Sequence, residues 1–188
     1  MNKILINQFV QEHSETIKKF DQLEIDNAVK IIVEALDNGS KIFWCGNGGS
    51  ASQANHLSAE LIGGMYKDKV NPFNSICLNV DTVFLTAWSN DDSFENIFSR
   101  QLQAIGKRGD ILMCLSTSGN SSNINNAATY AEKSGIKVIS LTGNDGGKLK
   151  SISNININVD SKSTQRIQEM HILIGHIICD LVENCHKS

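Results

Sequence analysis

The chain has 188 residues, of which 40% are hydrophobic and 20% are charged. Its 17 Lys and Arg residues against 20 Asp and Glu residues give a formal net charge of −3, without a basic block that would suit nucleic acid. No apolar run approaches the roughly 20 residues of a membrane span, and the N-terminus lacks the compact apolar segment of a signal peptide. We therefore expect one globular domain over residues 1–188, with no nucleic-acid or membrane partner.

We expect residues 1–38 to form a helical extension ahead of the first strand. Apolar residues recur there at steps of three and four until Gly39, and a break near Asp21 divides the stretch into two helices. So much apolar surface needs a partner. We expect these helices to pack on the sheet, on partner subunits, or on both, and we expect an oligomer with sites near its subunit interfaces.

Strands and helices alternate from residue 41 onward. The strands are expected in apolar runs at 41–45, 75–80, 111–115, 137–142 and 154–159. The helices are expected at 50–65, 82–89, 94–105, 123–135, near 146–150, and at 164–185. This alternation predicts an α/β fold in three layers, with about five parallel strands covered by helices on both faces.

Two polar loops lead from an apolar strand into a helix, CGNGGSAS after the first strand and LSTSGNSSN after the third. Ligands of open parallel sheets bind beyond the carboxyl ends of strands at a topological switch point, so the loops serve one ligand if these strands are neighbours. Glycines allow close backbone approach, and hydroxyls beside a helix N-terminus suit a small phosphate. Neither GxGxxG as a whole nor GxxxxGK[ST] is present, so we expect no nucleotide cofactor. The alternative is that both loops are only helix caps and tight turns.

Two helices carry side chains that could perform chemistry. His56 and Glu60 share one face of the helix after the first loop, where they could bind a metal, divide base and orienting roles, or form a solvated pair. The last helix is apolar nearly all round, so Gln168, His171 and His176 need partners, and each histidine is alternatively a hydrogen-bonded core residue. Gln168 and His176 lie about 12 Å apart along the axis. They reach one small ligand only if their side chains lean together or two subunits contribute.

The phosphoheptose isomerases, which have the sugar-isomerase (SIS) fold, contain motifs similar to CGNGGSASQANHLSAEL, SNDDSFE, LSTSGNSSNI, LTGNDGGKL and TQRIQEMHILIGHIICDLVE. The resemblance covers about residues 40–185. It implies a flavodoxin-like fold and conversion of D-sedoheptulose 7-phosphate to D-glycero-D-manno-heptose 7-phosphate through an enediol. It also implies a homotetramer that acts in the cytoplasm, ahead of heptose addition to lipopolysaccharide or capsule.

The same resemblance implies roles for individual residues. The acid/base pair would be Glu60 and His176. The phosphate would be held by Ser116, Thr117, Ser118 and Ser121. The sugar would be contacted by Asn47, Gly48, Gly49, Glu60, Asn90, Asp91 and Gln168. One zinc ion per subunit, as some members carry, would be bound by His56, Glu60, Gln168 and His176.

An isomerase is favoured over two other functions. A non-catalytic SIS module that binds a phosphosugar or the replication initiator protein would not need Glu60, Gln168 and His176 together. A sensor for another phosphosugar would be expected to carry a DNA-binding segment. The residue types also suit isomerisation, because a carboxylate can move a proton between neighbouring carbons while an imidazole serves the oxygens.

Overall fold

In a computed structural model, which describes residues 2–65 and 71–187, a five-stranded parallel sheet forms the centre of the molecule. Its order is β2-β1-β3-β4-β5, and every neighbouring pair is parallel. The strands are β1 (Ile42–Gly46), β2 (Ser75–Cys77), β3 (Ile111–Ser116), β4 (Lys137–Gly143) and β5 (Ile155–Val159). The first and third strands are neighbours, as a shared ligand for the two polar loops requires.

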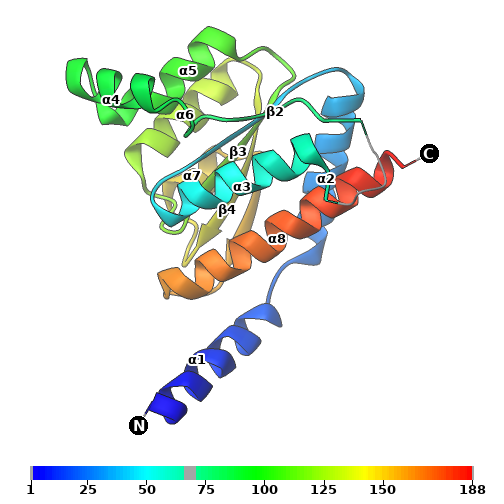
Figure 1. Cartoon of the computed structure of the whole chain (residues 1–188), viewed down its shortest axis with the longest axis vertical. Helices are drawn as coiled ribbons and strands as arrows, with labels where there is room; N and C mark the ends of the chain where they lie inside the picture. Colours follow the sequence, from blue (N-terminus) through cyan, green and yellow to red (C-terminus); the bar gives the residue numbers. More distant parts are fainter. Residues whose placement is uncertain (1, 66–70, 188) are drawn as a thin grey trace.

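Helices cover both faces of this sheet (Figure 1). One layer contains α2 (Gln22–Asp37), α3 (Gly49–Gly63) and α8 (Thr164–Cys185). The other contains α4 (Thr82–Asp91), the short 3₁₀ helix η1 (Phe94–Asn96), α5 (Ile97–Ile105), α6 (Ser122–Lys133) and α7 (Gly147–Ile152). The predicted three-layer α/β fold with about five parallel strands is confirmed.

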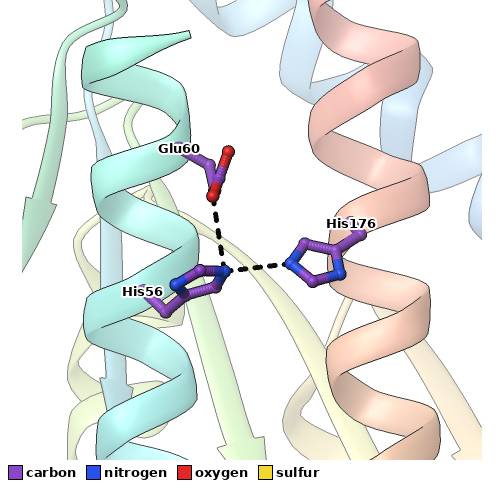
Figure 2. Close-up of side chains that lie close together, drawn as sticks. All are labelled: His56, Glu60 and His176. Carbon is purple, nitrogen blue, oxygen red and sulfur yellow. Dashed lines mark hydrogen bonds and ion pairs between the residues drawn. The ribbon is translucent and has the colours of Figure 1, made fainter. Parts of the chain in front are cut away.

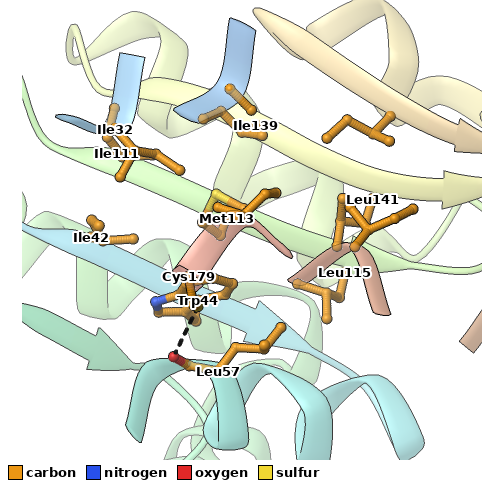
Figure 3. Packing of buried hydrophobic residues seen from close by; sticks show 14 of the residues in the cluster. Ile32, Ile42, Trp44, Leu57, Ile111, Met113, Leu115, Ile139, Leu141 and Cys179 are labelled. Atoms are coloured by element: carbon orange, nitrogen blue, oxygen red, sulfur yellow. Dashed lines mark hydrogen bonds between the residues drawn. The ribbon is translucent and has the colours of Figure 1, made fainter. Parts of the chain in front are cut away.

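The core divides into two parts because side chains alternate along each strand. On β1, Ile42 and Trp44 face α2, α3 and α8, whereas Phe43 and Cys45 face the opposite layer. Figure 3 shows the first part, in which labelled residues of β1, β3 and β4 lie in one buried cluster with Leu57 of α3. The buried indole of Trp44 keeps a partner, because its Nε1 donates to Ser75 Oγ at 2.9 Å. This packing fixes α3 and α8 on the same face of the sheet.

Most elements agree with the sequence expectation to within two residues at each end, and two differ by more. β2 ends at Cys77, not at residue 80, because the side chain of Asn79 bonds the backbone of Gly46 where further strand pairing would lie. The expected helix at 94–105 begins as the 3₁₀ turn η1, and Ser93 caps this turn by accepting from Glu95 N. The α8 bounds agree with the expected 164–185, and Ser163 is its N-cap.

The N-terminal helix α1 (Asn2–Ile17) extends away from the body of the molecule and buries no residue (Figure 1). It is tied to the start of α8, where Arg166 Nη1 donates to the Phe9 carbonyl at 2.6 Å. His13 Nδ1 also lies 2.8 Å from Glu169 Oε2. In contrast, α2 buries one apolar side against the sheet and α8. No helix within the described ranges has the length and apolarity that a bilayer crossing requires.

Candidate functional site

Three of the predicted site residues come together between α3 and α8. His56 and Glu60 extend from one face of α3, and His176 points at them from α8 (Figure 2). His56 Nε2 lies 3.0 Å from His176 Nε2 and 3.3 Å from Glu60 Oε1. The His56 side chain is 50% exposed and that of Glu60 is 24% exposed, so a solute can reach the cluster.

The donor atoms of this cluster suit a metal ion. One nitrogen from each histidine and one carboxylate oxygen all lie within 4.8 Å of one another. Two nitrogens bound tetrahedrally to zinc stand about 3.3 Å apart, close to the 3.0 Å between the two Nε2 atoms. Nitrogen and oxygen donors in this arrangement are typical of zinc sites. The residues present therefore fit zinc.

Close contact between the two helices brings the cluster together. A Cβ atom on Gly175, next to His176, would lie 2.3 Å from Leu57 Cδ1, so only a glycine lets α8 pass this near α3. Further along the crossing, Cys179 Sγ lies 3.8 Å from the Leu57 carbonyl. Burial raises the pKa of Cys179 to about 12, and the nearby carboxylates of Glu60 and Glu183 contribute to this rise. This thiol therefore stays protonated and is no nucleophile.

Gln168 lies at the opposite end of the contact between α3 and α8. Its side-chain amide lies beside Gly49, where a Cβ would lie 2.7 Å from Nε2. Its backbone carbonyl accepts from Gln53 Nε2 at 2.7 Å. Gln168 is therefore held at the start of α3, two turns before His176 on α8, and its role as a fourth metal ligand stays a prediction.

The two polar loops are joined by a pair of amides. Asn47 Nδ2 donates to Asn123 Oδ1 at 2.8 Å, and Asn123 Nδ2 donates back to Asn47 Oδ1 at 2.9 Å. Asn123 is 2% exposed on α6 and was not among the predicted site residues. Asn123 lies on the same face of α6 as the buried residues Ala127 and Ala131. The sequence could have indicated a role for it, because a polar side chain on a buried face needs a hydrogen-bond partner. This pair fixes the loop after β1 relative to the loop after β3.

The hydroxyl-rich loop after β3 borders a cavity of about 470 Å³. Ser116 Oγ and Ser121 Oγ lie 3.5 Å apart at the base of the loop, and Thr117 and Ser118 line the cavity. Gly119, at φ +62°, packs so tightly on the loop before α7 that a Cβ would meet the Gly146 carbonyl. The remaining lining residues are Asn120, Asn144, Lys162, Thr164 and Ile167. Because the last two belong to α8, this helix borders both the cavity and the His56 cluster.

Asn90 and Asp91 belong neither to the His56 cluster nor to the lining of the cavity. Both are exposed at the end of α4, where Asn90 Nδ2 donates to Asp91 Oδ1 at 2.8 Å. No hydrogen bond or ion pair within residues 2–65 and 71–187 links them to the other candidate residues. Their contact with a sugar stays a prediction.

His171 is a core residue, the alternative that the sequence left open. It is fully buried, and its Nε2 donates to the Thr142 carbonyl at 3.1 Å. Burial lowers its pKa to about 4, so the ring is neutral near pH 7. It contacts β4 on the side of α8 that faces the sheet, away from the His56 cluster.

The SIS domain family matches residues 7–143, a span that includes both polar loops and four of the five strands. The chain is 46% identical to a phosphoheptose isomerase of Aliarcobacter butzleri, with 98% of each chain covered. The solved phosphoheptose isomerase of Neisseria gonorrhoeae gives a TM-score of 0.92 at 35% identity, covering 98% of this chain and 100% of that one. The Francisella tularensis enzyme gives 0.91 at 35% identity, covering 98% and 99%. The chain belongs to the phosphoheptose isomerase family.

Proposed function

We propose that the chain is a sugar-phosphate isomerase that converts D-sedoheptulose 7-phosphate to D-glycero-D-manno-heptose 7-phosphate. The observation that carries the proposal is the meeting of Glu60 with His176 across α3 and α8, in a chain whose relatives are phosphoheptose isomerases. The relatives give no support to a non-catalytic binding module. Heptose made in this way would serve lipopolysaccharide or capsule synthesis in the cytoplasm.

The reaction moves a carbonyl from C2 to C1 of the sugar. A proton leaves C1 to form an enediol, and a proton is then delivered to C2, while the C1 oxygen loses a proton and the C2 oxygen gains one. Glu60 is suited to carry the proton between the carbons, because a carboxylate beside both can act first as base and then as acid. His176 is suited to exchange protons with the oxygens or to open the ring.

The two ends of the substrate would be held by different elements. The phosphate would lie at Ser116, Thr117, Ser118 and Ser121, where hydroxyls and the N-terminal N–H groups of α6 favour an anion. Asn47, the exposed backbone of Gly48 and Gly49, and Gln168 would contact the sugar from the loop after β1 and from α8. Because α8 passes from this cavity to His176, it would align the sugar between the phosphate site and the acid/base pair.

Replacement of Glu60 tests the assignment of the base. We expect the wild-type protein to isomerise sedoheptulose 7-phosphate, and Glu60→Gln to lower kcat by about 10²- to 10⁴-fold, since the amide cannot accept the proton. Deuterium uptake from solvent into the sugar carbon should fall in parallel. Glu132→Gln, an exposed change on α6, serves as the control. Wild-type turnover in Glu60→Gln would refute the assigned base, and an inactive wild type with zinc supplied would refute the proposed function.

A zinc ion is the cofactor that the His56 cluster supports. His56 and His176 would bind it through Nε2 and Glu60 through its carboxylate, with the Gln168 side-chain oxygen as a fourth ligand once its side chain turns from Gly49. When bound, zinc would supply a Lewis acid that polarises oxygen atoms of the sugar. This donor set is independent of the thiols, which are buried except for Cys185.

Metal content checks this assignment without relying on activity. We expect about one zinc per chain after incubation with zinc and gel filtration, and loss of most of it in His56→Ala, because the remaining imidazole, carboxylate and neutral amide hold zinc poorly. His13→Ala, which removes a histidine from α1, should retain the metal. Equal zinc in His56→Ala and the wild type would exclude this site.

A homotetramer is the assembly that we propose. The apolar side chains of α1 support it, because Ile4 is 72% exposed and Val10 is 61% exposed, and such side chains on an extended helix favour contact with another subunit.

A further inference from the structure

The cavity beside the hydroxyl-rich loop is lined by one residue, Lys162, that is not part of the phosphate site proposed above. Lys162 lines this cavity together with Thr117, Ser118 and Thr164. Among the described lining residues it is the only charged one, and the others offer hydroxyls, amides and one isoleucine. The cavity is therefore positively charged, with no carboxylate on its described lining to repel an anion.

Lys162 is not engaged elsewhere in the molecule. Its side chain makes no hydrogen bond or ion pair with residues 2–65 or 71–187, and the residue is exposed. The carboxylate closest to it in sequence, Asp160, lies 3.3 Å from the ammonium of Lys19. An unpaired ammonium at the rim of a polar cavity is available to a ligand.

The position of Lys162 in the fold keeps it beside the cavity. It lies between the end of β5 and Ser163, the N-cap of α8, whose Oγ accepts from Arg166 N. The loop that begins after β4 is also fixed there, because Asn144 N donates to the Ser161 carbonyl at 3.0 Å and the Asn144 carbonyl accepts from Asn158 Nδ2 at 2.9 Å. The backbone around Lys162 is therefore anchored, although its side chain is flexible.

We propose that Lys162 binds the phosphate group of the substrate and supplies the positive charge that the hydroxyl-rich loop lacks. A phosphate monoester carries close to two negative charges near pH 7. The hydroxyls of Thr117, Ser118 and Thr164 donate hydrogen bonds but leave that charge uncompensated. A lysine acts on phosphate as a point charge, which suits a flexible side chain at the cavity rim. This inference rests on the proposed function, because it takes the cavity as the phosphate site.

The test compares Lys162→Met with Lys162→Arg and with Lys133→Met, using inorganic phosphate and the sugar phosphate as ligands. Lys133 is an exposed lysine at the C-terminal end of α6, so its replacement changes the net charge equally at a distance from the cavity. We expect Lys162→Met to raise the KM for sedoheptulose 7-phosphate and the Ki for inorganic phosphate by about five- to tenfold, with kcat within about twofold. Lys162→Arg should keep wild-type values, and Lys133→Met should change neither constant.

Ionic strength gives a second readout that a purely structural role would not change. Phosphate binding by the wild type should weaken as salt is added, and Lys162→Met should show a smaller dependence, because one screened charge pair is gone. Unchanged KM, Ki and salt dependence in Lys162→Met would overturn the proposal, as would equal changes in Lys133→Met. If the wild type is active, such a result would refute the role of Lys162 but not the isomerase function. An inactive wild type whose phosphate affinity falls in Lys162→Met would refute the function and keep the phosphate site.

Discussion

The buried imidazole of His171 links the stability of the fold to pH. The ring is fully buried on α8 and donates from Nε2 to the Thr142 carbonyl, while its Nδ1 has no partner among the described residues. Burial disfavours the charged ring and lowers its pKa to about 4 from an ordinary value of 6.5, although the bond to Thr142 opposes part of this shift. The folded protein therefore holds His171 neutral in a range where the unfolded chain binds a proton.

This difference gives a direction for the pH dependence. Above pH 6.5 neither state is protonated at His171, and between 6.5 and about 4 only the unfolded state is. The free energy of unfolding should therefore fall as pH falls through this window, by up to about 3 kcal/mol from this residue. Urea unfolding across the window in wild type and His171→Gln would measure it, since other titrating groups are common to both. The variant should be less stable near pH 7 but lose less stability on acidification, and parallel curves would contradict the assignment.

Single residues of the candidate site were predictable to different degrees. The pairing of His56 with Glu60 follows from their spacing of one helical turn, which needs no tertiary information. The meeting with His176 depends on how α8 crosses α3, and the resemblance to known isomerases supplied it, not the spacing. Lys162 belongs to no periodic pattern, so only the folded cavity reveals it.

At the scale of elements, the crossing of α3 and α8 holds the candidate site together. Gly175 lies against Leu57, and a Cβ at Gly175 would come within 2.3 Å of Leu57 Cδ1 and 3.1 Å of its Cγ. Leu57 is fully buried and has little free space into which to move. Any side chain at residue 175 must therefore displace Leu57 or push α8 away from α3.

A single methyl group should test this crossing. We expect Gly175→Ala to lower the free energy of unfolding by about 1–3 kcal/mol through overpacking, and to lower turnover because His176 moves from His56 and Glu60. Gly63→Ala is the matched control, since a Cβ on this helical glycine at the end of α3 would meet nothing within 4 Å, and the variant should gain up to about 1 kcal/mol. Thermal or urea unfolding measures both. Equal stability of Gly175→Ala and the wild type would show that the crossing tolerates the methyl group.

Helices and strands followed from the sequence where local signals agree. The bounds of α8 agree because Ser163 caps a long apolar helix, and both signals are local. The early end of β2 was missed because it depends on bonds between Asn79 and Gly46, which lie 33 residues apart. The 3₁₀ turn before α5 was missed because helical periodicity does not separate η1 from the helix that follows it.

At the scale of the whole molecule, α1 presents an apolar surface that the described chain does not cover. Ile6 is 58% exposed and Val10 is 61% exposed, and the two lie one turn apart on the same face of the helix. The contacts of Arg166 with Phe9 and of His13 with Glu169 hold the base of α1 against α8. A helix that is anchored to the body while its apolar side chains stay exposed is suited to contact another subunit.

Charged substitutions on this face should therefore change the assembly without altering the fold of the subunit. We expect the wild type to have a light-scattering mass of about four chains of 20.6 kDa at micromolar concentration. Ile6→Lys with Val10→Lys should reduce this mass to about one or two chains, because burying two ammonium groups in an apolar contact is unfavourable. Asn7→Lys with Gln11→Lys adds the same charge on the polar face of α1 and should keep the wild-type mass. A monomeric wild type, or an unchanged mass in the Ile6 and Val10 variant, would show that α1 does not hold the subunits together.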